Sequence, residues 1–318
     1  MYHAVVSDPL QVPDWCFLDA EMFRRQIAYV KRHFRVVGLS EAIQLLSAGS
    51  VNQPTLVITF DDGYQNNYEV AFPILAHYDC PATIFLTTSY VDSDHIPAFC
   101  RLNLALSLTS KRSIEWGGEA YDLSSAIRKS QASIALHQAL KNLHPYRIEI
   151  AVGDVCRLLE VDTTRRFDSG SPYHMLRTEA IGSMVKSGLV TFGGHTHNHT
   201  ILSRLSPSEQ HDEISGSLRR VEDWTGQRCE AFAYPNGSRA DYDGSSIEVL
   251  QSLGVLTAVS TISGPNNVRT PRMELRRYGI GPDVNFASFT STVHHVTHRM
   301  KRFAQASVDM SDGQQERS

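Results

Sequence analysis

The chain has 318 residues, 42% hydrophobic and 20% charged, a composition typical of a globular protein rather than of a disordered or fibrous one. Its formal net charge of −4 gives no basis for binding nucleic acid or an anionic membrane through bulk electrostatics. The five cysteines are scattered and form no CxxC pair, which argues against a disulfide framework and favours a reducing compartment.

Export signals are not visible in the sequence as given. No apolar run approaches the roughly 18 residues of a transmembrane helix, and MYHAVVSDPL lacks the basic and apolar regions of a signal peptide. We therefore expect a cytoplasmic protein, or an exported or periplasmic one if the natural start lies upstream.

Short apolar runs alternate with stretches of helical periodicity in the first ninety residues. The predicted elements are a strand at 1–6, a helix at 19–33, a short helix capped by Ser40, the buried strand PTLVITF at 54–60, a helix at 66–78 and the strand PATIFLT at 81–87. The order strand, helix, strand is one βαβ unit, and it favours a parallel sheet.

Residues 90–170 interrupt this alternation with a more polar, mostly helical pattern, in which WGGEAYDL suggests a small hairpin or loop. We interpret them as an insertion that covers one end of the sheet. The alternation resumes with a helix at 176–187, the strand LVTFGG at 189–194 and a helix from Pro207 to Thr225. A strand and turn, EAFAYPNG at 230–237, a helix at 245–253 and a last strand, LRRYGIG at 275–281, follow. The 207–225 helix has the strongest signals, because Ser206 and Glu209 can form a capping box and Gly226 follows its end. We expect one domain over residues 1–290 and a polar, partly disordered tail over 291–318.

Chemically capable side chains follow three of the predicted strands. Asp61 and Asp62 follow one strand, HTHNH at 195–199 follows another and YPNG at 234–237 follows a third. In parallel α/β folds these positions face the functional side. An isolated DDG is more often a turn, and an isolated HxxxH is more often a surface or core pair. Their joint occurrence on strand-end loops favours a functional site.

The paired carboxylates predict a metal site. Two adjacent carboxylates repel unless a cation joins them, and a borderline ion such as zinc takes imidazole nitrogen together with carboxylate oxygen. His195 and His199 are four residues apart, a spacing that can bring both rings to one ion. One aspartate would then hold the metal, while the other would act as general base on a water molecule.

TFDDGY, GGHTHNHTILS and FAYPNG, in this order, resemble the motifs of the polysaccharide deacetylases of carbohydrate esterase family 4, the NodB-homology domain. The resemblance implies a distorted or incomplete (β/α) barrel. It also implies that Asp61 is the catalytic base and that Asp62, His195 and His199 bind a divalent metal, with Zn²⁺ the first candidate and Co²⁺ or Ni²⁺ as alternatives. The backbone N–H of Asn236, in the Tyr234-Pro235-Asn236 turn, would hold the oxyanion.

The sequence departs from the family pattern at two places. Many members carry an arginine where this chain has Ala233, and we expect Arg277, rather than Arg276, to replace it in orienting the base. Many members also carry a late Leu-x-His motif that supplies the general acid, and we find none here. The opening MYHAV instead resembles the YHxV signature of the exopolysaccharide-associated branch, whose strand order is circularly permuted. This match implies that His3 protonates the leaving amine.

The resemblance implies an N-deacetylase that acts on a polysaccharide, oligosaccharide or glycan precursor containing N-acetylhexosamine. Tyr64 is a candidate for stacking on the sugar, as are Trp116 and Trp224, although core packing is the simpler expectation for Trp224. Two alternatives stay open: a hydrolase of a non-sugar amide, and a non-catalytic carbohydrate-binding protein. Ala233 gives some support to the second alternative, whereas the intact Asp61 argues against it. A glycan is the expected partner, and the oligomeric state is open.

Overall fold

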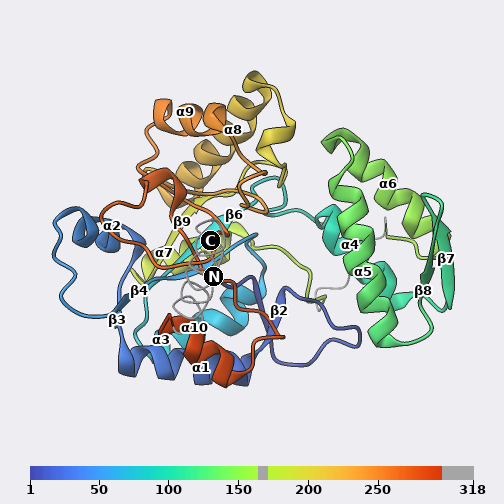
Figure 1. Ribbon diagram of the computed structural model, residues 1–318, viewed down its shortest axis with the longest axis horizontal. Coiled ribbons are helices and arrows are strands. Elements are labelled where there is room, and N and C mark those ends of the chain that lie inside the picture. Colours follow the sequence, from blue (N-terminus) through green and yellow to red (C-terminus); the bar gives the residue numbers. More distant parts are fainter. Residues whose placement is uncertain (164–170, 296–318) are drawn as a thin grey trace, which may run out of the picture.

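The computed structural model describes residues 1–163 and 171–295. At its centre lies a five-stranded sheet in the order β11-β10-β9-β6-β5, in which every pair of neighbours is parallel (Figure 1). Its strands are β5 (Ile58–Phe60), β6 (Ala82–Leu86), β9 (Val190–Gly194), β10 (Ala231–Ala233) and β11 (Thr257–Val259). Most of their side chains are buried, as expected for a parallel sheet that is covered on both faces.

Helices connect successive strands of this sheet. They are η1 (Asn67–Ala71, a π-helix) and α3 (Phe72–His77) between β5 and β6, α7 (Thr178–Lys186) before β9, α8 (Pro207–Thr225) between β9 and β10, and α9 (Gly244–Ser252) between β10 and β11. The predicted capping box of α8 is confirmed, with Ser206 and Glu209 bonded reciprocally and Gly226 in the left-handed conformation after the helix.

Two segments extend the sheet toward a barrel. The N-terminal strands β1 (Ala4–Val6) and β2 (Phe17–Asp19) pair in parallel. Tyr2 forms a parallel bridge to β5, and Leu275 forms one to β11. The N–H of Ile280 donates to the carbonyl oxygen of Met1 at 2.9 Å, so the 275–280 segment links the two edges of the sheet. The expected incomplete (β/α) barrel is therefore confirmed, and residue 277 lies between β11 and the end of β5.

A helical lobe lies at one end of the molecule, on the right of Figure 1. It comprises α4 (Ala98–Leu108), β7 (Ser113–Trp116), β8 (Glu119–Asp122), α5 (Ala126–Lys141) and α6 (Pro145–Leu158). The lobe has its own hydrophobic core, which includes Leu102, Leu136 and Val152. β7 and β8 are antiparallel, so the hairpin suggested by WGGEAYDL is confirmed.

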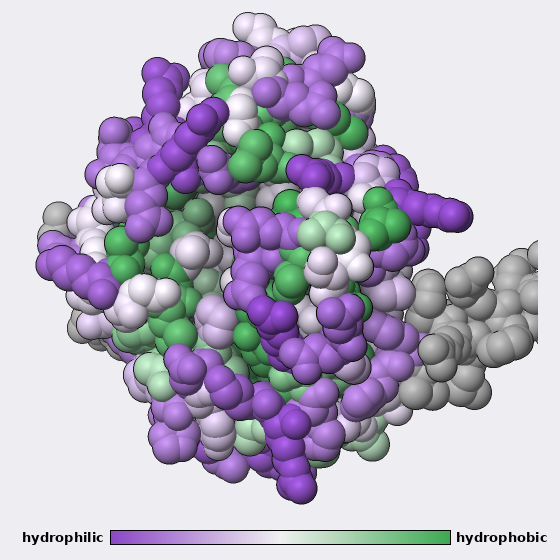
Figure 2. Space-filling model, turned by 90° about the vertical axis from the view of Figure 1, so that its left-hand side faces the viewer, coloured by the Kyte–Doolittle hydropathy of each residue, from purple (hydrophilic) through white to green (hydrophobic). Residues whose placement is uncertain are grey.

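The remaining elements surround the sheet. They are α1 (Ala20–His33), β3 (Arg35–Val36), α2 (Leu39–Ser47), β4 (Thr55–Leu56), two 3-10 turns, η2 (Leu202–Arg204) and η3 (Arg272–Glu274), and α10 (Phe286–Val293). Figure 2 shows the side that carries α2, where apolar residues lie in small groups among polar ones around a central hollow. Within the described residues, no helix combines the length and apolar character that crossing a bilayer requires.

Three predictions about individual elements were wrong. Ser40 is not a helix cap, because α2 begins at Leu39 and its N-cap is Gly38. The strand at 54–60 is broken at Val57 into β4 and β5. LRRYGIG is not a strand, since only Leu275 forms a bridge. Residues 296–318 of the predicted tail lie outside the described residues.

Candidate active site

Asp61 and Asp62 lie in the turn that follows β5. Both carboxylates are almost fully buried, and the N–H of Asp61 donates to the carbonyl oxygen of Tyr2 at 3.0 Å. The turn packs tightly on β6, because a Cβ at Gly63 would lie 2.7 Å from the Leu86 side chain. Only glycine fits that approach together with its φ of +84°. The local sequence therefore fixes where the two acids lie.

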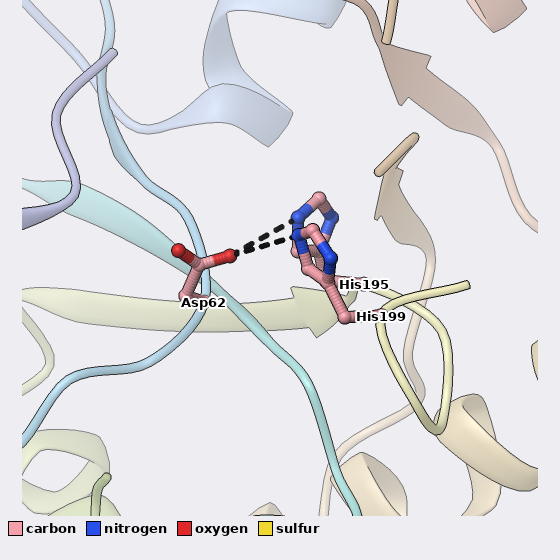
Figure 3. A group of neighbouring side chains, drawn as sticks. All are labelled: Asp62, His195 and His199. Atoms are coloured by element: carbon pink, nitrogen blue, oxygen red, sulfur yellow. Dashed lines mark ion pairs between the residues drawn. The ribbon is translucent and has the colours of Figure 1, made fainter. Parts of the chain in front are cut away.

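The histidines come from the loop that follows β9, two strands from β5 in the sheet (Figure 3). His195 is buried, and its Nδ1–H donates to the carbonyl oxygen of Ala233 at 2.7 Å. This hydrogen bond fixes the ring and directs Nε2 toward Asp62. The Nε2 atoms of His195 and His199 lie 3.5 and 3.3 Å from Oδ1 of Asp62. The structure thus brings together the three expected ligands.

The chemistry of these three residues fits a divalent metal ion. Oδ1 of Asp62 is buried and has no well-formed hydrogen bond within the described part of the chain. Its contacts of 3.3 and 3.5 Å with the two rings are long for charge-assisted hydrogen bonds, which measure about 2.7–2.9 Å. They match the separation of about 3.4 Å between neighbouring ligands of a tetrahedral ion bound at about 2.1 Å. Three protein ligands also leave a position for water or substrate, as in catalytic zinc sites.

The electrostatics of the group also favour a bound cation. Burial acts to raise the pKa of Asp62, but His195 and His199 hold it well below its usual range. Burial acts to lower the pKa of His195, but Asp62 and Asp61 outweigh it, so the pKa is raised. The protein therefore stabilises positive charge on the His195 ring. A metal ion would displace the ring proton on binding.

Asp61 is held by a buried arginine. Nη1 and Nη2 of Arg277 donate to Oδ1 and Oδ2 of Asp61 at 2.6 and 2.7 Å, a bidentate pair. Nε of Arg277 donates to the carbonyl oxygen of Ser260 at 2.9 Å, which fixes the guanidinium plane. Burial acts to raise the pKa of Asp61, but Arg277 outweighs it and the pKa is lowered. Asp61 is therefore an oriented, ionised carboxylate, and Arg277 rather than Arg276 reaches it.

His3 lies close enough to this group to interact electrostatically with Asp61 and Asp62. Its ring contacts Trp15 edge to face, with centroids 5.0 Å apart, and its carbonyl oxygen accepts from Asn67 Nδ2 at 2.6 Å. Burial lowers the pKa of His3, although the two aspartates act in the opposite direction. This direction favours neutral imidazole, so the expected acid role is supported by position and not by the pKa.

The YPNG turn directly follows Ala233, whose carbonyl oxygen accepts the hydrogen bond that orients His195. Asn236 is partly exposed, with a left-handed φ of +56°, and its carbonyl oxygen accepts from Thr261 Oγ1 at 2.6 Å. Its backbone N–H donates no hydrogen bond to any residue that the structure describes. This N–H is therefore available to a ligand, as the oxyanion prediction requires.

The rings of Tyr64, a candidate for stacking on the sugar, and of Tyr234, in the turn expected at the oxyanion, are both buried. The Tyr64 ring is 1% exposed, and its hydroxyl lies 3.3 Å from Sγ of Cys100 in the helical lobe. The Tyr234 ring is fully buried, stacks on Tyr242 and donates through its hydroxyl to the carbonyl oxygen of Met273. Neither ring can lie against a sugar because both fill the core. Pro235 is buried as well.

Backbone conformation at the site is unusual. Of the eight non-glycine residues with positive φ among the described residues, four belong to these loops: Asp62, Thr196, His199 and Asn236. Such conformations cost about 1–3 kcal/mol for ordinary residues and persist where the surrounding structure imposes them. Their concentration in these loops is typical of a functional site, where the surrounding structure imposes conformations that an ordinary turn would avoid.

A residue that the motifs did not reveal anchors the histidine loop. Glu213, on α8, accepts through Oε2 from the N–H groups of His197 and Asn198, both at 2.9 Å. Its Oε1 accepts from Nδ2 of Asn198 at 2.7 Å. Glu213 thereby fixes the loop between the two ligands. His197 contacts Thr88 Oγ1 through Nδ1 and is not a member of the ligand group.

We expect Glu213→Ala to lower metal affinity by about 10–100-fold, because outer residues that orient ligands have effects of this size. Competition for zinc with a chromogenic chelator measures the change. The matched control is Asp212→Ala, since the Asp212 side chain is 82% exposed and pairs with His211. Equal zinc affinities for the two variants would show that Glu213 does not hold the loop.

Comparisons with known proteins agree with this geometry. A family model described as polysaccharide deacetylase matches residues 48–258. The poly-beta-1,6-N-acetyl-D-glucosamine N-deacetylase of Staphylococcus epidermidis is 33% identical over 102 residues, 32% of this chain. The match spans 34% of that relative, about a third of its length.

Two solved structures have a similar fold. The Streptococcus pyogenes deacetylase PplD, in complex with acetate, has a TM-score of 0.62 at 19% identity and covers 92% of this chain and 96% of its own. IcaB from Ammonifex degensii has a TM-score of 0.58 at 18% identity and covers 92% of this chain and 94% of its own. At these identities the likeness concerns the fold.

Proposed function

The chain belongs to the polysaccharide deacetylase family, and from this premise we propose that it is a metal-dependent hydrolase that removes N-acetyl groups from a glycan containing N-acetylhexosamine. The observation that carries the proposal is the oriented, ionised Asp61, held by Arg277 beside the group formed by Asp62, His195 and His199. A general base next to a metal-ligand group is the arrangement that amide hydrolysis requires.

Asp62, His195 and His199 would hold a divalent metal, with zinc the first candidate from the mixed nitrogen and oxygen donors. When bound, the metal supplies Lewis-acid polarisation of the amide carbonyl and of water. Asp61 takes the proton of the attacking water. Each of its oxygens retains a lone pair beside the bond to Arg277, so the bidentate pair orients the base without blocking it.

Two further groups complete the reaction. The N–H of Asn236 donates to the oxyanion that forms as water adds to the carbonyl, and such a donor stabilises the transition state. His3 then passes to the departing nitrogen the proton that Asp61 took from the water, so its neutral resting form is compatible with this role. One water is consumed, the C–N bond breaks, and acetate and a free amino sugar are released.

The substrate class is proposed from a relative, and hydrolysis is preferred to binding from the residues of the site. The Staphylococcus epidermidis relative is named for poly-beta-1,6-N-acetyl-D-glucosamine, which supports a polymer of N-acetylhexosamine as the substrate. A protein that only bound carbohydrate would not need an ionised carboxylate fixed by a buried arginine. We therefore prefer hydrolysis to simple binding.

The proposal is tested by incubating purified, zinc-loaded protein with N-acetylglucosamine oligomers and analysing the products by mass spectrometry. We expect oligomers that have lost acetyl groups, with one free amine for each acetate released, and release slower by about 10²–10⁴-fold with the Asp61→Asn variant. Hydrolysis of a simple aryl acetamide without any action on oligomers would move the assignment to a non-sugar amide. Absence of hydrolysis in both assays would overturn it.

A further inference from the structure

Trp15 is an exposed tryptophan beside the candidate active site. Its side chain is 54% exposed, and its ring contacts His3 with centroids 5.0 Å apart at an interplanar angle of 76°. Exposure of a single apolar side chain is ordinary, and what singles out this indole is its contact with His3 of the candidate site. The sequence motifs gave no indication of this contact, because residue 15 lies outside all of them.

The neighbours of Trp15 are fixed in the protein. Asp14 is 7% exposed and accepts from the N–H of Cys16 at 3.1 Å, from Nδ2 of Asn103 at 2.6 Å and from the hydroxyl of Tyr173 at 3.2 Å. Cys16 is 5% exposed. Asp14 and Cys16 are therefore buried, while Trp15 between them is exposed. A buried carboxylate that contacts both α4 and the segment before α7 holds this loop in one position.

The backbone of Trp15 is fitted against a second segment. A Cβ at Gly281 would lie 2.8 Å from the carbonyl oxygen of Trp15, closer than such contacts allow. Because residue 281 is glycine, the backbone at Trp15 can pack closely against the segment that follows Arg277. Trp15 is exposed on a rigid loop and not on a free one. Rigid aromatic side chains bind ligands at a low cost in conformational entropy.

We propose that Trp15 forms a sugar-binding subsite in which its indole ring stacks on the apolar face of a pyranose ring of the glycan. The inference rests on the proposed function and deepens it. A hexopyranose has one face rich in C–H groups, and an indole beside the reacting centre offers a flat apolar surface with a polar N–H at its edge. The contact with His3 puts this surface next to the group that faces the leaving nitrogen.

The subsite assigns Trp15 a role in binding and not in chemistry. An interaction made equally with substrate and transition state changes KM and leaves kcat unaltered. We expect Trp15→Ala to raise KM for N-acetylglucosamine oligomers by about two- to thirteenfold, the range for an aromatic contact of about 0.5–1.5 kcal/mol, at nearly constant kcat. Trp15→Phe keeps an aromatic face and should recover part of the loss. Unchanged KM in Trp15→Ala, or a fall in kcat alone, would overturn the subsite.

A second measurement does not depend on turnover. The chain has three tryptophans, and Trp224 packs against the main core. In an Asp61→Asn background, addition of N-acetylglucosamine oligomers should change the tryptophan fluorescence. The change should vanish in Trp15→Phe and persist in the matched control Trp224→Phe. A change that persists without Trp15 contradicts the subsite.

The two readouts separate this inference from the function on which it rests. If the wild-type protein releases no acetate but shows a fluorescence change that requires Trp15, the deacetylase assignment fails and the sugar subsite stands. If acetate is released with an unchanged KM in Trp15→Ala, the deacetylase stands and the subsite fails.

Discussion

Replacing Asp61 by asparagine is expected to lower kcat for acetate release by about 10²–10⁴-fold, the usual contribution of a general base. Asparagine keeps the size of the side chain but cannot take the proton of water. Asp62, His195 and His199 are untouched, so the variant should still bind metal. The measurement is steady-state acetate release at saturating substrate, with metal content determined on the same sample.

The control for this prediction addresses folding. Asp61 is paired with the buried Arg277, so its loss could weaken the protein as well as the chemistry. Thermal unfolding of the zinc-loaded variant should show a folded protein at the assay temperature. A folded, metal-loaded Asp61→Asn variant with wild-type kcat would show that another group is the base.

The second large effect is expected for Arg277→Met. The variant leaves the buried carboxylate of Asp61 without its partner, and loss of one member of a buried pair costs about 3–5 kcal/mol in the free energy of unfolding. It should also lower kcat, because the base loses its orientation and burial then raises its pKa. Denaturant unfolding and acetate release measure the two effects. Arg276→Met is the matched control, since Arg276 is exposed.

The effect of Arg277→Met on stability should depend on pH. In the wild-type protein the folded-state pKa of Asp61 is lowered, so the pair contributes stability above the unfolded pKa of about 3.9 and loses it as the pH falls through the folded value. The stability difference between wild type and variant should therefore be largest at neutral pH and shrink in acid. The double variant Asp61→Asn/Arg277→Met should be less destabilised than the sum of the single variants, because it removes both buried charges. Additive losses would indicate that the ion pair does not stabilise the fold.

Much of the site could be predicted because it lies where strands end. Asp61 and Asp62 follow an apolar run, and His195 and His199 follow another, so a parallel sheet brings both loops to one edge. The sequence pattern also indicates which of the adjacent residues Arg276 and Arg277 contacts Asp61. In an extended segment alternate residues face one side, and Leu275 and Arg277 are buried while Arg276 is exposed.

Other features depend on contacts between distant segments, and local patterns do not record such contacts. Tyr64 was expected at the substrate, but Cys100 of the helical lobe and Phe17 of β2 enclose its ring. Trp15 contacts His3, 12 positions away, and Glu213 contacts His197, 16 positions away. The turns between them have shapes that local sequence patterns do not predict. The helix start at Leu39 was missed because Ser40 has the chemistry of a cap, whereas the observed N-cap is Gly38, two residues earlier, and Leu39 is buried.

The central claim is that Asp62, His195 and His199 bind one metal ion on which amide hydrolysis depends. The most direct test is to titrate metal-free protein with zinc and record acetate release from N-acetylglucosamine oligomers at each addition. We expect activity to rise linearly and stop rising at one equivalent per chain, and His199→Ala to stay inactive at that ratio. Full activity in the metal-free protein, or a wild-type titration curve for His199→Ala, would contradict the claim.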